Sequence, residues 1–263
     1  MATGTNLVPQ SEVETTQARF ITATNFNPDL SIALPAYEEA ANLELLLPQL
    51  NEVARSLTPS YEIVVVDTES PRDNSPEICA KHNARYVARR EGNLYGHAIR
   101  TALTEARGRY VIFMDSDGSH NPNFIPQLWA HRETANLVIA SRYVSGGKTE
   151  NPAILIFMSH VVNYVFRIFL GLKCFDVSNS FRLYRGDELR ALRLKCNHFD
   201  IVEEILVKLV FSHRDYRVKE VPFVFEKRKA GKTKRVLLLF AIGYFVTLLH
   251  LWKLKRDARR EMH

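Results

Sequence analysis

The sequence predicts an α/β fold in which a mostly parallel sheet is flanked by helices. Between residues 31 and 141, short apolar runs typical of buried strands alternate with stretches whose apolar residues recur every three to four positions. Two of the strand-like runs, Tyr61–Asp67 and Arg109–Asp115, end on an aspartate. The length of 263 residues suits one large domain, or one domain with an appendage.

The elements expected in the first half follow from this alternation. Strands are expected over Ser31–Leu34, Tyr61–Asp67, Arg85–Ala88, Arg109–Asp115 and Leu137–Ser141. Helices are expected over Leu43–Leu57, Pro76–Asn83, Leu94–Ala106 and Pro122–Arg132. In such sheets ligands bind beyond the carboxyl ends of the strands, so the polar residues that follow three of these strands are expected to meet at one edge.

The second half is more apolar. Ala153–Leu170 carries its few polar residues on one helical face, which predicts an amphipathic helix. Further strands are expected over Ser180–Arg185 and Val221–Phe225, and further helices over Asp187–Arg193 and Ile201–Phe211. The stretch Val236–Trp252 has 17 residues without a formal charge and is flanked on both sides by Lys and Arg.

The charge of the chain is concentrated in one segment. The formal net charge is +6, yet Lys227–Arg260 contains eleven Lys and Arg residues and a single acid, so the rest of the chain is mildly acidic. This segment predicts an anionic partner. A nucleic-acid-binding module is one such reading, but the basic residues enclose an apolar stretch that would be a poor surface against DNA.

Three cysteines stand far apart without a C-x-x-C pair, at Cys79, Cys174 and Cys196. This spacing supports neither a zinc site nor a disulfide framework, and it favours a reducing compartment. Residues 1–28 are polar and rich in Thr, lack the pattern of a secretory signal, and are expected to form a mobile tail.

The sharpest chemical signal is Asp115-Ser116-Asp117, directly after an apolar strand. Two carboxylates two residues apart can converge on one divalent cation, and hard oxygen ligands suit Mg²⁺ or Mn²⁺. Such an ion would bridge a diphosphate and neutralise charge on a departing nucleotide. The alternative is an ordinary surface turn, since this tripeptide pattern is common.

Two more strand ends carry polar residues. Asp67, at the end of its strand, can accept hydrogen bonds from a nucleobase or ribose, or can cap the following turn. The segment Pro35–Glu39 can form a nucleotide pocket with Tyr37 against the base, whereas Glu38 and Glu39 can equally be acids of a first helical turn.

Several blocks in this order resemble inverting family 2 glycosyltransferases, and specifically the dolichol-phosphate and polyprenol-phosphate mannose synthases. The blocks general to family 2 are PAYEEAANL, YEIVVVDTESP and FMDSDGSHNP, at residues 35–43, 61–71 and 113–122. Those more specific to enzymes with a polyprenyl-phosphate acceptor are SRYVSGGK, VSNSFRLYR and EVPFVFEKRKAGKTK, at residues 141–148, 177–185 and 220–234. The resemblance implies a GT-A-type, Rossmann-like fold over residues 29–234.

The resemblance also implies roles for individual residues. The donor-binding set is Pro35, Tyr37, Glu39, Asp67, Glu69, Asp115, Ser116 and Asp117. The metal ligands would be Asp115, Asp117 and Ser119, and the catalytic set would be Asp117, Arg142, Arg228 and Lys234. The acceptor phosphate would contact Arg142, Ser159, Thr233 and Lys234, and Lys227–Lys234 would be a mobile loop that closes over donor and metal.

Two positions depart from the family pattern. Relatives have consecutive acids after the second strand, where this chain has Asp67-Thr68-Glu69. Close relatives carry Arg or Lys early in the helix after the SRY-GGK block, where this chain has the apolar segment Pro152–Ile156. The first departure concerns the contact to the base, and the second removes an expected cation for the acceptor phosphate.

The reaction implied is transfer of a sugar, mannose from GDP-mannose by the closest resemblance, to a polyprenyl or dolichyl monophosphate. A phosphate monoester with a second pKa of about 6 is largely dianionic at neutral pH, so no side chain need abstract a proton. The alternatives are another donor, such as UDP-glucose or a UDP-N-acetylhexosamine, or a hydroxyl acceptor. A hydroxyl acceptor would require a base such as Glu203 or Glu204, although this pair is more simply read as a helix position with one acid exposed.

A lipid acceptor requires a membrane surface. Residues 235–263 are therefore expected to form an apolar membrane-associated helix with a basic tail, lying in the cytoplasmic leaflet, with Ala153–Leu170 as a second contact. A single membrane span and a helix buried against a partner protein are the alternatives. A homo-oligomer or a membrane partner subunit is compatible with the sequence, and a different functional class, an inactive nucleotide-sugar-binding or regulatory subunit, is disfavoured by the intact Asp115 and Asp117.

Overall fold

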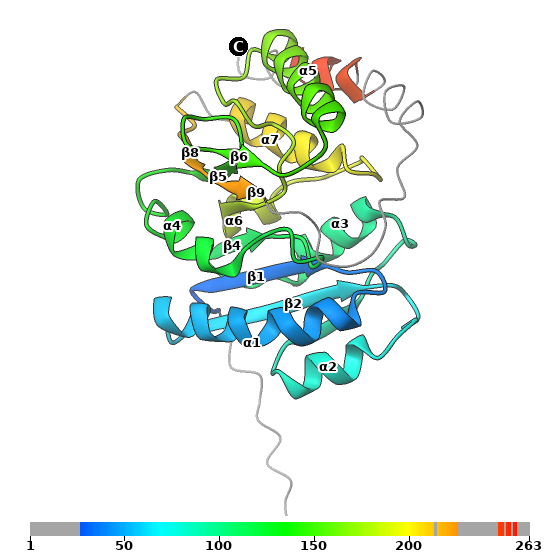
Figure 1. Cartoon of the computed structure of the whole chain (residues 1–263). Helices are drawn as coiled ribbons and strands as arrows, with labels where there is room; N and C mark the ends of the chain where they lie inside the picture. Colours follow the sequence, from blue (N-terminus) through cyan, green and yellow to red (C-terminus); the bar gives the residue numbers. More distant parts are fainter. Residues whose placement is uncertain (1–26, 213–214, 226–246, 250, 254, 257–263) are drawn as a thin grey trace, which may run out of the picture.

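The computed structural model describes residues 27–212, 215–225, 247–249, 251–253 and 255–256. Its centre is a seven-stranded sheet in the order β3-β2-β1-β4-β7-β5-β8 (Figure 1). The strands are β1 (Leu30–Pro35), β2 (Tyr61–Asp67), β3 (Arg85–Ala88), β4 (Tyr110–Phe113), β5 (Leu137–Ser141), β7 (Arg182–Arg185) and β8 (Val218–Pro222). Only β7 runs against its neighbours, which confirms the predicted mostly parallel sheet.

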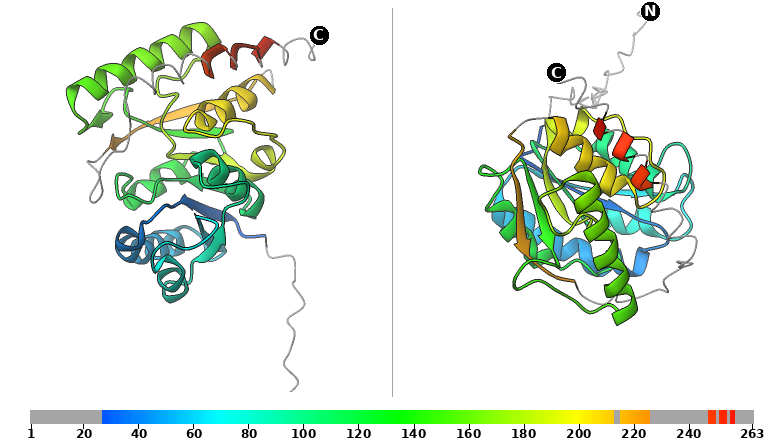
Figure 2. Two further views of the ribbon diagram at one scale, coloured as in Figure 1. Left: turned by 90° about the vertical axis from the view of Figure 1, so that its right-hand side faces the viewer. Right: turned by 90° about the horizontal axis from the view of Figure 1, so that it is seen from above.

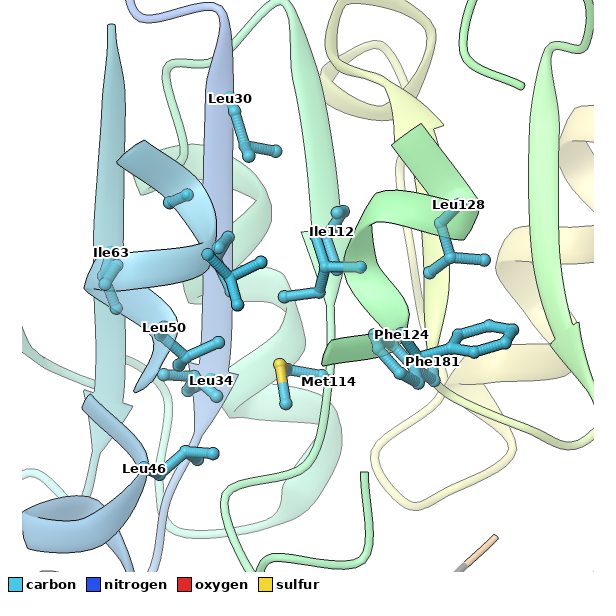
Figure 3. Close-up of a cluster of buried hydrophobic side chains, with 14 of the residues drawn as sticks. Leu30, Leu34, Leu46, Leu50, Ile63, Ile112, Met114, Phe124, Leu128 and Phe181 are labelled. Carbon is cyan, nitrogen blue, oxygen red and sulfur yellow. The ribbon is translucent and has the colours of Figure 1, made fainter. Parts of the chain in front are cut away.

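Helices cover both faces of the sheet. One face packs against α1 (Ala40–Leu57), α2 (Ser75–Lys81), the 3₁₀ turn η1 (Pro122–Phe124) and α4 (Ile125–Trp129). The other packs against α3 (Tyr95–Glu105), α6 (Gly186–Arg190) and α7 (Ile201–Ser212), and α5 (Ala153–Leu170) joins this core through Phe166 and Leu170. Figure 3 shows the first of these two cores, where Leu30 and Leu34 of β1 meet Leu46 and Leu50 of α1.

The covering of both faces explains why the strands read as continuous apolar runs. Along β1, Ile32 and Leu34 join the core beneath α1, while Ala33 between them joins the opposite core. In β2, Ile63 joins the core beneath α1 and Val64 joins the opposite core. Adjacent side chains of a strand point to opposite faces, so every position of a doubly covered strand has to be apolar.

Some predicted elements differ in extent. The expected strand Val221–Phe225 is two strands, because the chain leaves the main sheet after β8 and pairs again as β9 (Val224–Phe225) with β6 (Lys148–Thr149). The expected helix Pro122–Arg132 is a 3₁₀ turn followed by the short α4. Pro122 and Pro126 stand at the start of the two pieces, where proline is well tolerated because the first N–H groups of a helix have no partner within it.

The strand order reverses between β1 and β4, and the region beyond the carboxyl ends of these two strands is called here the crevice. The chain passes outward from β1 to β2 and β3, and then returns to β4 on the other side of β1. At such a point the loops that follow the two strands turn away in opposite directions, which opens a ligand site beyond their carboxyl ends. The loop after β1 and the loop carrying Asp115 and Asp117 are the two that meet there.

The helix α5 exposes its apolar side. Ala153–Leu170 was predicted with these bounds, and the helix ends at Gly171, whose φ of 65° is the left-handed conformation of a glycine C-cap. Its outward residues, called here the apolar stripe of α5, are 45–64% exposed; they are Ile154, Phe157, Val161, Tyr164 and Ile168. The polar Asn163, by contrast, is buried against the domain. Among the described residues, α5 is the helix whose length and composition would allow it to cross a membrane.

The described residues of the C-terminal stretch lie beside this helix. Residues 247–249, 251–253 and 255–256 are helical and, like α5, lie at the end of the molecule far from α1 and α2 (Figure 2). Leu248 and Leu251 are buried in the core beneath α7, whereas Leu249 and Trp252 are 48% and 42% exposed. The rest of the predicted segment 235–263, like residues 1–26, lies outside the described residues.

Candidate active site

Asp117 is held in a tight turn just beyond β4. Its Oδ1 accepts hydrogen bonds from the backbone N–H of Ser119 at 3.0 Å and from the Ser119 hydroxyl at 2.6 Å. Gly118 between them has a φ of 78°, a conformation that L side chains rarely adopt, and this lets the chain fold back onto the carboxylate. Ser119, predicted as a metal ligand, is therefore placed as a hydrogen-bond donor that orients Asp117.

Asp115 is surrounded by donors from distant parts of the chain. Its Oδ1 accepts from the Tyr95 hydroxyl at 3.3 Å and from the Ser180 hydroxyl at 3.0 Å. Its backbone N–H donates to Nδ1 of the buried His120 at 2.9 Å, and burial lowers the pKa of that imidazole. Burial, followed by the Asp115 charge, raises the pKa of Tyr95 well above its usual range, so its hydroxyl keeps its proton and remains a donor.

The donor set around these aspartates fits a hard divalent cation. Among the described residues, no group of three or more His, Cys, Asp and Glu side chains is placed to hold a metal alone. Two carboxylates are nevertheless what Mg²⁺ requires when substrate phosphates and water complete its coordination. Asp115 and Asp117 therefore suit an ion that arrives together with a diphosphate.

Ser116 joins this turn to β1. Its side chain is buried, and its hydroxyl donates to the Pro35 carbonyl at 2.8 Å. The hydrogen bond spans the crevice between β4 and β1 at the point where the sheet order reverses. Pro35 and Ser116, both predicted to bind the donor, thus set the distance between the two loops that form the site.

Asp67 ends β2 in a buried position. Its Oδ1 accepts from the Thr68 N–H at 2.8 Å, and burial raises the pKa of the carboxyl. Sequence reasoning missed its neighbour Arg89, which is 4% exposed. Arg89 donates from Nε to the Asp67 carbonyl at 3.0 Å, from Nη2 to the Ala36 carbonyl, and from Nη1 to the Asn93 carbonyl at 2.9 Å. One guanidinium thus ties together the loops after β1, β2 and β3.

The remaining predicted donor residues lie on the outer side of this rim. The Arg72 guanidinium lies 5.3 Å from the centre of the Tyr37 ring, which places Tyr37 beside the loop after β2. Glu39 precedes α1, where the first helical N–H is capped by Asp73 at 3.0 Å. Glu69 is exposed and joins Asn93 through its backbone N–H at 3.2 Å.

On the acceptor side, the predicted phosphate ligand Arg142 is paired with Asp176. The guanidinium donates from Nε and Nη2 to the two carboxylate oxygens at 2.8 and 2.7 Å, and from Nη2 to the Ser178 hydroxyl at 2.9 Å. Asp176 is fully buried, and although burial opposes its ionisation, Arg142 and several donors hold its pKa below the usual range. The sequence analysis did not identify Asp176.

Ser159 of α5 lies next to the same group. The Ser159 side chain lies near the Tyr143 hydroxyl, and the centroid of the Tyr143 ring lies 4.4 Å from that of the His160 ring. Arg142 in turn lies 5.0 Å from the Tyr143 ring centre. Arg142 and Ser159 thus both lie beside Tyr143, and their role toward an acceptor phosphate stays a prediction. Arg228, Thr233 and Lys234, the other predicted members, lie outside the described residues.

The acids on α7 correct one expectation. Neither is exposed: Glu203 is 1% and Glu204 0% accessible. Glu204 accepts the backbone N–H groups of Lys195 and Cys196 at 2.9 and 2.8 Å and pairs with Lys208 at 2.7 Å, which together hold its pKa below the usual range despite burial. Burial raises the pKa of Glu203 to about 8. Glu204 thus anchors a loop, and neither acid faces solvent as a base for a hydroxyl acceptor would.

The model of the family described as glycosyl transferase family 2 matches residues 31–192. This range begins at the second residue of β1, extends past β7 and includes Asp115 and Asp117.

Two curated relatives extend the similarity beyond that range. A dolichol-phosphate mannosyltransferase of Pyrococcus furiosus is 32% identical over 235 residues, covering 86% of this chain and 64% of its own length. The chain therefore spans somewhat less than two thirds of that relative. An undecaprenyl-phosphate mannosyltransferase of Micrococcus luteus is 34% identical over 217 residues, covering 76% of this chain and 85% of the relative.

Solved structures confirm the GT-A fold class. Glucosyl-3-phosphoglycerate synthase of Mycobacterium tuberculosis, crystallised with Mn²⁺, UDP and glucosyl-3-phosphoglycerate, matches with a TM-score of 0.66 at 19% identity, covering 86% of this chain and 80% of that one. The same protein crystallised with Mg²⁺ and UDP matches with a TM-score of 0.66 at 18% identity, with the same coverage of both chains. At this identity the likeness concerns the fold.

Proposed function

Because the chain belongs to glycosyl transferase family 2, we propose that it transfers mannose from GDP-mannose to a polyprenyl or dolichyl monophosphate with inversion at the anomeric carbon. That the chain is a glycosyltransferase follows from the family. The donor sugar and the lipid acceptor are the proposal, and the names of the two mannosyltransferase relatives support it.

The observation that carries the proposal is the position of α5. The apolar stripe of this helix faces away from the domain, while Ser159 on its inner side lies at Tyr143, beside Arg142. An acceptor phosphate near Arg142 would therefore have an apolar surface beside it. A lipid with a phosphate head group combines these two chemistries in one molecule.

The donor would bind along the carboxyl edge of β1, β2 and β4. Asp67 and Tyr37 would contact the nucleoside, and Asp115 and Asp117 would lie at the diphosphate. A bound Mg²⁺ or Mn²⁺ would neutralise the charge that develops on the leaving nucleoside diphosphate. The Ser116–Pro35 hydrogen bond fixes the separation of the two loops, so the aspartates are oriented before the donor arrives.

The acceptor would attack without a general base. A phosphate monoester is already largely dianionic at neutral pH, so the acceptor oxygen needs no deprotonation. The burial of Glu203 and the anchoring of Glu204 support a phosphate over a hydroxyl acceptor, because neither carboxylate is open to an incoming alcohol. A single in-line displacement inverts the anomeric carbon.

Membrane attachment is part of the same proposal. The apolar stripe of α5, together with the exposed Leu249 and Trp252, would enter the cytoplasmic leaflet, while the buried Leu248 and Leu251 keep the C-terminal stretch on the domain. Burying one side of such a helix in the interface is typical of peripheral attachment. We expect extraction with alkaline carbonate to release the protein from membranes, whereas a transmembrane helix would retain it.

The test is a transfer assay with labelled nucleotide sugars and polyprenyl phosphate in detergent, with Mn²⁺. We expect label in the lipid phase from GDP-mannose, and much less from UDP-glucose, UDP-N-acetylglucosamine or dTDP-sugars. Transfer from another donor would overturn the assignment of mannose. Transfer only to hydroxyl acceptors would overturn the phosphate acceptor, and binding of nucleotide without any transfer would indicate a regulatory subunit.

A further inference from the structure

Two hydroxyl groups from separate segments converge on one oxygen of Asp115. Tyr95 is the first residue of α3, and Ser180 lies just before β7, yet both hydroxyls donate to Oδ1, at 3.3 and 3.0 Å. The chain separations are 20 and 65 residues.

The Tyr95 hydroxyl cannot swing away without breaking a packed arrangement. The Tyr95 ring is stacked on Phe199 with centroids 4.2 Å apart and planes at 19°. The next residue, Gly96, donates its N–H to the Asn197 carbonyl at 2.8 Å, and a Cβ on Gly96 would lie 2.5 Å from the Cys196 carbonyl oxygen. The start of α3 therefore lies directly against the segment 196–199.

That segment is itself anchored. Glu204 accepts the N–H groups of Lys195 and Cys196, and Arg100 of α3 donates to the Cys196 carbonyl at 2.6 Å and to Asn197 Oδ1 at 2.8 Å. Glu204 is buried and is therefore not an exposed base. It holds the start of the segment 195–199, whose Phe199 ring is stacked on Tyr95. A series of contacts thus links Glu204 of α7, the segment 196–199, Tyr95 and the Asp115 carboxylate.

We propose that Tyr95 and Ser180 are positioning residues that orient the Asp115 carboxylate for the divalent cation and donor diphosphate. This inference rests on the proposed function, since it assigns the two hydroxyls a role toward the ion that Asp115 would bind. Groups that hydrogen-bond a metal-ligating carboxylate set its orientation, and their removal typically weakens metal affinity or activity about 10- to 100-fold. Two donors on Oδ1 fix the rotation of the carboxylate about its Cβ–Cγ bond.

The hydroxyls can be removed without removing the side chains. Tyr95→Phe keeps the ring that stacks on Phe199, and Ser180→Ala deletes one oxygen at a site that is 9% exposed. Tyr61→Phe is the matched control, because its hydroxyl donates to Asn51 at 3.0 Å at the opposite edge of the sheet. Each variant loses one tyrosine or serine hydroxyl, but only two of the three lose a contact to Asp115.

The measurement is the Kd of Mn²⁺ at saturating GDP, followed through the EPR signal of free Mn²⁺, which does not depend on turnover. We expect the Kd to rise about 10-fold in Tyr95→Phe and in Ser180→Ala and further in the double variant, with Tyr61→Phe unchanged. Nucleotide binding in EDTA and the midpoint of thermal unfolding are expected to stay within the range of the control.

Three results would overturn the inference, and they are distinguishable. If the wild-type protein binds Mn²⁺ with GDP and both variants bind it equally well, Tyr95 and Ser180 do not position Asp115, while the proposed function stands. If the wild-type protein binds no Mn²⁺ with any nucleoside diphosphate, the metal-dependent mechanism fails and the inference fails with it. An equal loss in Tyr61→Phe would show a general effect of hydroxyl removal and would also contradict it.

Discussion

The donor side and the acceptor side of the site are built differently. On the donor side, the loops after β1, β2, β3 and β4 are joined to one another, through Arg89 and through the Ser116–Pro35 hydrogen bond. On the acceptor side, one buried ion pair, Arg142–Asp176, lies beside a helix whose apolar stripe has no partner among the described residues.

The difference follows from what each side is proposed to bind. A nucleoside diphosphate and a metal ion need several ligands in one geometry, so preorganised loops reduce the cost of ordering them. A lipid acceptor arrives from a membrane and needs one phosphate contact and an apolar surface. We therefore expect changes on the donor side to affect catalysis, whereas changes on the acceptor side away from the phosphate contact itself should affect stability or membrane binding.

The largest effect is expected for Asp117→Asn. The substitution keeps the shape of the side chain but removes the charge that would face the metal and diphosphate, so we expect the transfer rate to fall about 1,000-fold. The initial rate of label transfer measures it. Asp187→Asn is the control, since Asp187 is an exposed acid in α6 at the opposite edge of the sheet and should keep full activity. If Asp117→Asn kept its transfer activity, the role proposed for Asp117 in binding metal and diphosphate would be wrong.

Breaking the buried pair on the acceptor side should mainly affect stability. Asp176→Ala leaves the Arg142 guanidinium buried without its carboxylate, and we expect unfolding in urea to be easier by about 3 kcal/mol. The exposed pair Arg109–Glu133, 3.8 Å apart, is the control, and Glu133→Ala should change little.

The pH dependence gives this ion pair a second test. The pKa of Asp176 is lowered in the folded state, so its stabilising contribution is present above the unfolded pKa and is lost as the pH falls through the folded one. The wild-type protein should therefore lose more stability than Asp176→Ala on acidification below about pH 4. If the free energy of unfolding fell equally with pH in the wild-type protein and in Asp176→Ala, the contribution assigned to the ion pair would be wrong.

The apolar stripe of α5 should decide membrane binding without affecting the fold. Phe157 is 64% exposed, so Phe157→Glu removes no packing, but it should weaken partitioning to anionic vesicles by about 2 kcal/mol, or roughly 30-fold. Co-sedimentation with vesicles measures this. Leu45→Glu is the matched control, because Leu45 is equally exposed, at 64%, on α1 at the far end of the molecule. Equal losses in both variants would argue against a specific membrane face.

Substituting the two acids of α7 should change the stability of the protein at pH 8 in opposite directions. The Glu203 carboxyl, with its pKa raised to about 8, binds its proton more tightly folded than unfolded, so it reduces stability as the pH rises from about 4.5 to about 8. Glu203→Gln should therefore stabilise the protein at pH 8 and leave its stability unchanged at pH 4.

Glu204→Gln provides the contrast to that prediction. The pKa of Glu204 is lowered, so its contribution is present above the unfolded pKa, and the variant should lose stability at pH 8. Urea unfolding at both pH values measures the two effects. A loss of stability at pH 8 in both variants would show that Glu203 is ionised in the folded protein.

The sequence alone predicts the elements whose signal is local. The strands Tyr61–Asp67, Arg85–Ala88 and Leu137–Ser141 and the helix Ala153–Leu170 were predicted with the bounds observed, because each is a run with its own periodicity. Asp115 and Asp117 could also be predicted, because they directly follow an apolar strand and the carboxyl ends of parallel strands lie at one edge of the sheet.

What could not be predicted depends on contacts between distant residues. Arg89 bonds the Ala36 carbonyl 53 positions away, and nothing in its local pattern distinguishes it from Arg90. Asp176 and Ser180 can be recognised as site residues only from the fold, which brings their loop into contact with Arg142 and Asp115. Two adjacent acids on a helix predicted one exposed carboxylate, whereas loop 195–200 covers the face of α7 on which Glu204 lies.

The most direct test of the account compares polyprenyl phosphate with the corresponding polyprenol as acceptors, in vesicles, with GDP-[¹⁴C]mannose and Mn²⁺. Since neither Glu203 nor Glu204 is open to an incoming alcohol, we expect label in the lipid phase with the phosphate alone, released as free mannose by mild acid. Transfer to the polyprenol at a comparable rate, or lipid-linked label that mild acid does not release, would contradict it.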